Sequence, residues 1–136
     1  MTRVAPVFLV VALAVALSAC GTATSPDPAL PATLTLAPGQ ESTVGALTLR
    51  FTGITSDSRC PGDAICIQAG DVTAAFQATT GKVPATFALQ LNDPARSSAT
   101  VGDYTIHLTI VSPYPFVSLP PIDPEDYRIE VEVRGG

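Results

Sequence analysis

The chain of 136 residues contains no tryptophan, a single lysine, a single histidine and three cysteines. Seven Lys and Arg residues stand against twelve Asp and Glu residues, which gives a net charge of −5. An acidic chain without a basic patch repels phosphate backbones, so a nucleic-acid partner is not expected. Zinc sites need three or four Cys, His or carboxylate ligands in a set arrangement. With no such pattern here, we expect neither a metal nor a cofactor.

The amino-terminal segment is short and apolar. After Arg3, residues 4–17 read VAPVFLVVALAVAL, and Leu17-Ser18-Ala19-Cys20 follows. This run is shorter than the ~20 residues that span a bilayer. A charged start, an apolar centre and small residues at the end indicate a secretory signal over residues 1–19.

This segment resembles a bacterial lipoprotein signal peptide, because residues 17–20 match the lipobox. The resemblance implies cleavage before Cys20, a diacylglyceryl group on the Cys20 thiol and further acylation, with palmitate as the expected type of chain. Two acyl chains anchor a protein stably, whereas one does not. We therefore expect a lipid-anchored, extracytoplasmic protein of the cell envelope. An ordinary cleaved signal followed by an unmodified cysteine is the alternative.

Residues 20–31 carry Ser, Thr, Pro and Ala without a hydrophobic period, and we interpret them as a lipidated amino terminus and tether. Extended at ~3.1 Å per residue, such a segment reaches roughly 34 Å. Loss of residues 1–19 removes the charge of Arg3, so the net charge falls from −5 to −6. The tether would hold a small acidic domain clear of the lipid.

Residues 32–136 show the period-two pattern of β-strands and no sustained helical period. We expect a single antiparallel β-sandwich, or a small barrel, because polar and apolar faces alternate. The expected strands cover residues 33–36, 44–54, 72–79, 86–91, 104–110 and 127–133. The side chains expected to point inward are Leu34, Leu36, Leu47, Leu49, Phe51, Phe76, Phe87, Leu89, Leu91, Ile106, Leu108, Ile110, Ile129, Val131 and Val133.

Cys60 and Cys66 flank a Pro61-Gly62 turn, and a secretory signal places them where disulfides persist. With Cys20 lipidated, the remaining cysteine number is even, so we predict a Cys60–Cys66 disulfide. The ring would stabilise the fold by ~2 kcal/mol in the chain-entropy model.

Other interpretations of this segment need more than the sequence offers. Arg59, which we expect to be exposed beside the ring, would suit the acidic pocket of a trypsin-like protease, so a protease inhibitor is one alternative. A thiol enzyme or a metal enzyme is another. Both would depend on His107, which the alternation places on the polar face of its strand. No phosphate-binding loop, nucleophile elbow or zinc-protease motif is present, so we predict no catalytic residue.

Four short motifs carry a wider resemblance. Residues 57–61 read DSRCP, residues 66–70 read CIQAG, residues 112–115 read SPYP and residues 124–127 read PEDY. Together they resemble a set found in small uncharacterised bacterial secreted proteins and lipoproteins, over most of residues 45–134. Gln68 departs from the pattern, which often has Trp there. The resemblance implies domain boundaries but no activity.

Residues 112–122 form a stiff, proline-rich connection, because proline cannot donate to a strand ladder. They are either a structural lid or a contact surface. In the second case Tyr114, Phe116 and Leu119 would form an aromatic and aliphatic patch for a partner, together with Arg59. Asp123, Glu125 and Asp126 are expected to form a solvated turn.

The sequence therefore predicts a non-catalytic binding or interaction module. Its expected partners are the membrane, through the lipid on Cys20, and an envelope protein or other ligand.

Overall fold

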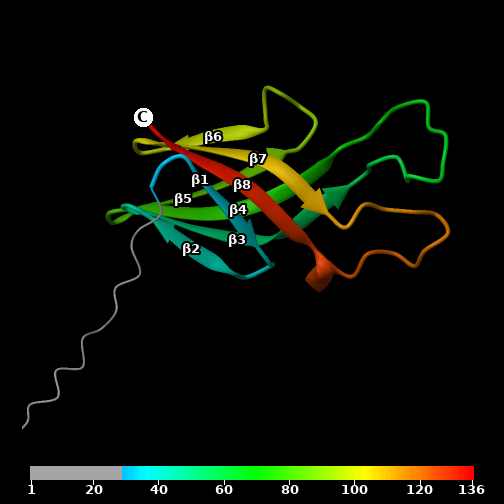
Figure 1. Cartoon of the computed structure of the whole chain (residues 1–136), viewed down its shortest axis with the longest axis horizontal. Coiled ribbons are helices and arrows are strands. Elements are labelled where there is room, and N and C mark those ends of the chain that lie inside the picture. Colours follow the sequence, from blue (N-terminus) through cyan, green and yellow to red (C-terminus); the bar gives the residue numbers. More distant parts are fainter. Residues whose placement is uncertain (1–28) are drawn as a thin grey trace, which may run out of the picture.

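The computed structural model describes residues 29–136, which form two antiparallel sheets packed face to face (Figure 1). The expected signal peptide, the Cys20 lipidation site and most of the tether lie outside the described residues. Within residues 29–136, no helix is both long and apolar enough to cross a membrane.

Each sheet has four strands. The first has the order β1-β8-β7-β6 and the second has the order β2-β3-β4-β5. The elements are β1 (Ala32–Leu36), β2 (Glu41–Val44), β3 (Leu47–Asp57), β4 (Val72–Thr80), β5 (Val83–Gln90), β6 (Ser98–Val101), β7 (Tyr104–Ser112), the 3-10 helix η1 (Pro124–Asp126) and β8 (Arg128–Gly135). The predicted β-sandwich is confirmed, and the described strands do not close into a barrel.

Two strands differ from the expected set. The apolar run 44–54 is divided into β2 and β3 by a hairpin, in which Gly45 takes a φ of +58° that favours glycine. Strand β6 was not among the expected strands. Its signal is the Gly102-Asp103 pair, a two-residue turn that joins it to β7.

The core lies between the two sheets. Fourteen of the fifteen side chains expected to point inward are buried in the core or packed partly buried against it, with Phe87 and Leu91 in the second group. Phe76 lies near the centre, with its ring centroid 5.8 Å from that of Phe51 and 5.5 Å from that of Phe87. The alternation in the sequence therefore predicted the inner faces of both sheets.

Ile110 is the exception among the expected core residues. The prediction was wrong because β7 has a bulge between Leu108 and Ile110 where it pairs with β8. The extra residue reverses the alternation, so Ile110 is exposed and Val111 is buried in its place.

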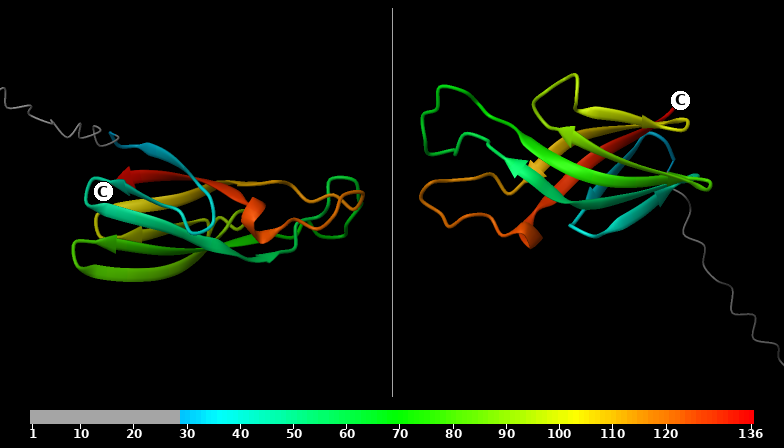
Figure 2. Two further views of the ribbon diagram at one scale, coloured as in Figure 1. Left: turned by 90° about the horizontal axis from the view of Figure 1, so that it is seen from below. Right: turned by 180° about the vertical axis from the view of Figure 1, so that it is seen from behind.

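The sandwich has two distinct ends. At one end, which we call the tether end, Leu30 and Pro31 lie beside Gly135 and Gly136, so the chain enters the domain next to its carboxyl terminus. At the other end, the loop end, two long connections extend beyond the sheets (Figure 1). Both views in Figure 2 place these connections at the same end, opposite the entering chain.

Candidate functional site

The candidate site is built from the two connections at the loop end. Residues 58–71, the disulfide loop, join β3 to β4, and residues 113–123, the proline loop, join β7 to η1. All four motifs that carry the wider resemblance lie in these loops or directly beside them. The fold therefore brings together segments that are far apart in the sequence.

The predicted disulfide between Cys60 and Cys66 is present in the disulfide loop. The loop is also closed at its base, where Ser58 N donates to Asp71 O at 2.7 Å and Cys60 N donates to Ala69 O at 2.8 Å. The sulfur atoms are thus held in a closed loop and are not free thiols, which a thiol enzyme would require.

Arg59 is buried, with 4% of its surface exposed, so the expectation of an exposed arginine was wrong. Its guanidinium donates from Nη1 to Val111 O at 2.8 Å and from Nη2 to Pro113 O at 2.9 Å. It also lies over the ring of Tyr114, 5.0 Å from the centroid. Arg59 thereby links the disulfide loop to the start of the proline loop, and its side chain is not available to a protease pocket.

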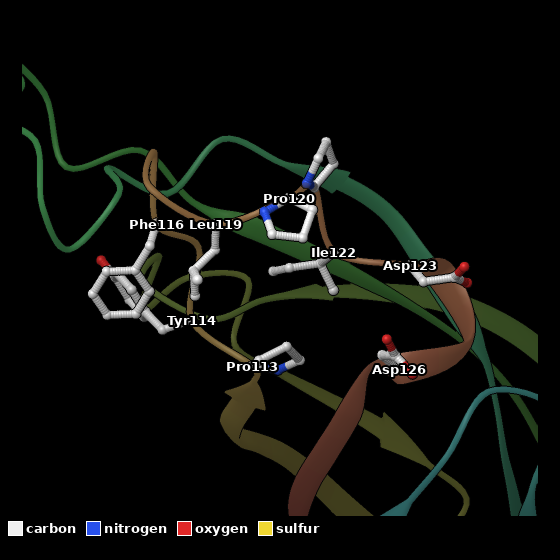
Figure 3. A pocket seen from close by; sticks show the side chains of 9 residues that line it. Pro113, Tyr114, Phe116, Leu119, Pro120, Ile122, Asp123 and Asp126 are labelled. Atoms are coloured by element: carbon white, nitrogen blue, oxygen red, sulfur yellow. The ribbon is translucent and has the colours of Figure 1, made fainter.

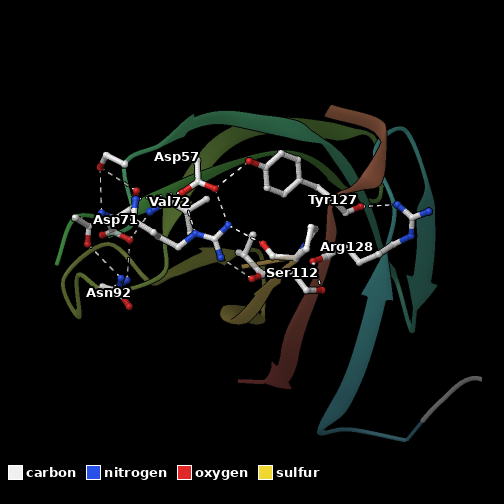
Figure 4. Close-up of polar contacts among 12 residues, drawn as sticks. Asp57, Asp71, Val72, Asn92, Ser112, Tyr127 and Arg128 are labelled. Atoms are coloured by element: carbon white, nitrogen blue, oxygen red, sulfur yellow. Dashed lines mark hydrogen bonds and ion pairs between the residues drawn. The ribbon is translucent and has the colours of Figure 1, made fainter. Parts of the chain in front are cut away.

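Asp57 is the ionic partner of Arg59. Arg59 Nε donates to Asp57 Oδ1 at 2.8 Å, and Arg59 Nη2 donates to Asp57 Oδ2 at 2.6 Å. Tyr127 Oη donates to Asp57 Oδ2 at 2.9 Å, and Figure 4 shows Tyr127 reaching toward Asp57 from the start of β8. Among residues 29–136, no buried side-chain nitrogen or oxygen lacks a hydrogen-bond partner. We call Asp57, Arg59 and Tyr127 the buried polar cluster.

The environment of the buried polar cluster sets its charges. Burial alone would raise the pKa of Asp57, but the hydrogen bonds from Arg59 and Tyr127 outweigh it and bring that pKa below its ordinary value of 3.8. Burial and the neighbouring Asp57 raise the pKa of Tyr127. The cluster therefore contains an ionised Asp57, a charged Arg59 and a neutral Tyr127 at neutral pH. Its charges cancel within the protein.

Asp63 connects the tips of the two loops. Its carboxylate accepts from Val117 N at 2.6 Å and from Ser118 N at 2.9 Å. Gly62 N donates to Pro115 O at 2.9 Å, beside the ring of Phe116. The two loops are thus joined at their base by Arg59 and at their tips by Asp63.

Exposed apolar side chains gather on the joined loops. Residues 29–136 contain nine large apolar side chains that are exposed, and six of them lie on the two loops. These six, which we call the apolar tip, are Ile65, Ile67, Tyr114, Phe116, Val117 and Leu119. Isolated exposed apolar residues are ordinary, but a contiguous group is typical of an interaction site.

The proline loop also borders a groove with a volume of about 500 Å³. Tyr114 and Phe116 lie at one end of the groove, Leu119 and Ile122 lie along it, and Asp123 and Asp126 lie at the other end (Figure 3). Pro113, Pro120 and Pro121 complete the wall. The groove therefore has an apolar length and an acidic end.

The sequence identified part of this surface. Tyr114, Phe116 and Leu119 are exposed in the apolar tip, and Arg59 lies beneath it instead of on it. The sequence analysis missed Ile65, Ile67 and Val117. Two isoleucines around Cys66 in a short polar loop are a signal that was present, because such a loop has no strand partner to cover them.

Two other kinds of site were considered from the sequence. His107 is half-buried on β7 and pairs across the sheet with Glu132. The part of the chain that the structure describes contains no group of three or more His, Cys, Asp or Glu side chains placed to hold a metal ion.

Comparisons with known proteins give no family assignment: no family model, no curated protein and no solved structure matches the chain.

Replacing Arg59 by alanine is expected to lower the free energy of unfolding by ~3–5 kcal/mol, because Asp57 would lose its charged partner at a largely buried position. Urea unfolding followed by circular dichroism measures this change. Arg134→Ala is the matched control, since Arg134 pairs with Glu132 on the exposed face of β8 and its loss should change stability little. Equal effects of the two substitutions would contradict the structural role of Arg59.

The contact made by Asp63 should depend on pH. Hydrogen bonds from Ser118 and Val117 lower the pKa of Asp63 from 3.8 to about 2. Because the folded pKa is depressed, the contact is fully present above pH 3.8 and is lost as the pH falls through about 2. The amide proton shifts of Val117 and Ser118 should follow this midpoint in an NMR titration, and Asp63→Asn should abolish the transition. A midpoint near 3.8 would show that the loops are not joined in this way.

Proposed function

We propose that this chain is a lipid-anchored, non-catalytic binding module of the bacterial cell envelope, and that the apolar tip is its contact surface. The observation that carries the proposal is the gathering of exposed apolar side chains on two loops that are fastened to each other. Such a surface lowers solubility, and monomeric proteins rarely keep one without a partner.

The position of the tip supports a partner other than the anchoring membrane. The chain enters the domain at the tether end, and the tip lies at the opposite end (Figure 2). A lipid on Cys20 and a tether over residues 20–31 would therefore present the tip away from the bilayer that holds the protein. The acidic net charge also disfavours contact with anionic lipids.

The construction of the loops supports binding in a second way. The disulfide, the Arg59 hydrogen bonds and the Asp63 contacts hold the loops in one arrangement before any partner arrives. Loops that are ordered in advance lose less conformational entropy on association, so more of the interaction energy appears as affinity.

Site-specific photocrosslinking in the producing cells tests the contact surface. We expect p-benzoylphenylalanine in place of Val117 to give an adduct with a protein of the envelope. Val83 is the matched control position, because it is equally exposed, at 69% against 71% for Val117, but lies at the start of β5, away from the loop end. Adducts at both positions, at neither position, or only with lipid at position 117 would contradict the proposed surface.

The anchor has its own test. Cys20→Ser should release the protein from the membrane fraction or block its processing, because only a thiol can receive the diacylglyceryl group. Fractionation with metabolic labelling by a fatty-acid analogue measures both effects. Unchanged processing and unchanged membrane retention would rule out lipidation at Cys20.

A further inference from the structure

The groove beside the proline loop has two kinds of wall. Its longer part is lined by Tyr114, Phe116, Leu119 and Ile122 together with prolines, and its end is lined by Asp123 and Asp126 (Figure 3). Its volume of about 500 Å³ lies within the range of natural ligand pockets, ~300–1,000 Å³. An occupant that fills it must offer apolar surface along most of its length.

The acidic end is not neutralised by the part of the protein that the structure describes. None of the three ion pairs among residues 29–136 includes Asp123 or Asp126. The nearest arginine in the sequence, Arg128, donates from Nη1 to the carbonyl oxygens of Glu125 at 2.8 Å and Tyr127 at 2.6 Å. The Asp123 carboxylate accepts a backbone hydrogen bond, from Glu125 N to Oδ1 at 3.1 Å. Two carboxylates next to apolar surface therefore favour a cationic group on the occupant.

We propose that this groove binds a polypeptide segment in which an aromatic or aliphatic side chain lies next to a lysine or arginine. The inference rests on the proposed function and specifies the chemistry of the partner. The apolar side chain lies against Tyr114, Leu119 and Ile122, and the basic group lies at Asp123 and Asp126. Charge pairs at the edge of an apolar surface are less screened than pairs in open water.

The surroundings of the groove favour a polypeptide over a small molecule. Phe116 and Leu119 belong both to the groove and to the apolar tip, so the apolar surface continues beyond the groove to Val117 and the disulfide loop. A small molecule in the groove would leave Ile65, Ile67 and Val117 exposed to water. A polypeptide can fill the groove and cover the tip at the same time.

A phage-displayed library of random nine-residue peptides tests the inference. The bait is the full chain in dilute detergent, immobilised through a tag after Gly136, which lies at the tether end and leaves the groove open. We expect the selected peptides to share an aromatic or aliphatic residue within three positions of Lys or Arg. A selected peptide, made synthetically, should bind at least tenfold more weakly to the Asp123→Asn/Asp126→Asn variant.

The amide substitutions remove the charge and keep the shape of both side chains. The side-chain oxygen at position 123 would still accept the hydrogen bond from Glu125 N. Asp103→Asn is the control, because Asp103 is an exposed carboxylate in the β6–β7 turn, and this variant should bind as the wild type does. Circular dichroism checks that both variants keep the fold.

Each outcome bears on the inference. Selection of basic and apolar peptides that depend on Asp123 and Asp126 supports it. Selection of purely apolar peptides, binding that both variants retain, or no selection at all overturns it. The proposed function fails separately, through the crosslinking at position 117. A protein adduct there without basic peptides in the selection would keep the binding module and remove this partner chemistry.

Discussion

The ion pair between Asp57 and Arg59 is the interaction on which the loop end of this protein depends. Arg59 follows the last residue of β3 by two positions, and its guanidinium reaches the backbone carbonyls of Val111 and Pro113, which are 52 and 54 residues away in the sequence. Burying an arginine is costly unless its charge is balanced and its donors are occupied. Asp57 balances the charge, and the two carbonyls and Tyr114 occupy the remaining surroundings. The two loops can lie together only while this balance is kept.

This arrangement separates two tasks within a small domain. The core between the sheets holds the fold, and the buried polar cluster positions the loops that extend beyond it. The Cys60–Cys66 disulfide and the Asp63 contacts then fix the outer part of the loops, where a core cannot reach. Apolar side chains are exposed on this frame, whereas the exposed positions of the strands are mostly polar, with threonine the most frequent. The contrast distinguishes the loop end from the rest of the described surface.

Sequence reasoning predicted the sandwich because its strands alternate strictly, as in Ile129, Val131 and Val133 of β8. It failed at Ile110, since a bulge depends on how two strands pair and leaves no mark in the alternation of one strand. It predicted the disulfide from the even number of cysteines that remain after Cys20. It failed at Arg59, because a charged residue beside a turn is usually exposed, and its partners lie in a distant part of the chain. Local pattern thus predicts which residues form strands, and only the tertiary structure shows which polar residue is buried.

The central claim is that the two loops form one ordered surface before any partner binds. Measurement of ¹⁵N relaxation across residues 58–71 and 113–123 tests it most directly. The account predicts backbone order parameters of about 0.85 in both loops, close to those of the strands. Values below about 0.6 in either loop, with ordered strands, would contradict it, because the buried polar cluster would then not hold the loops together.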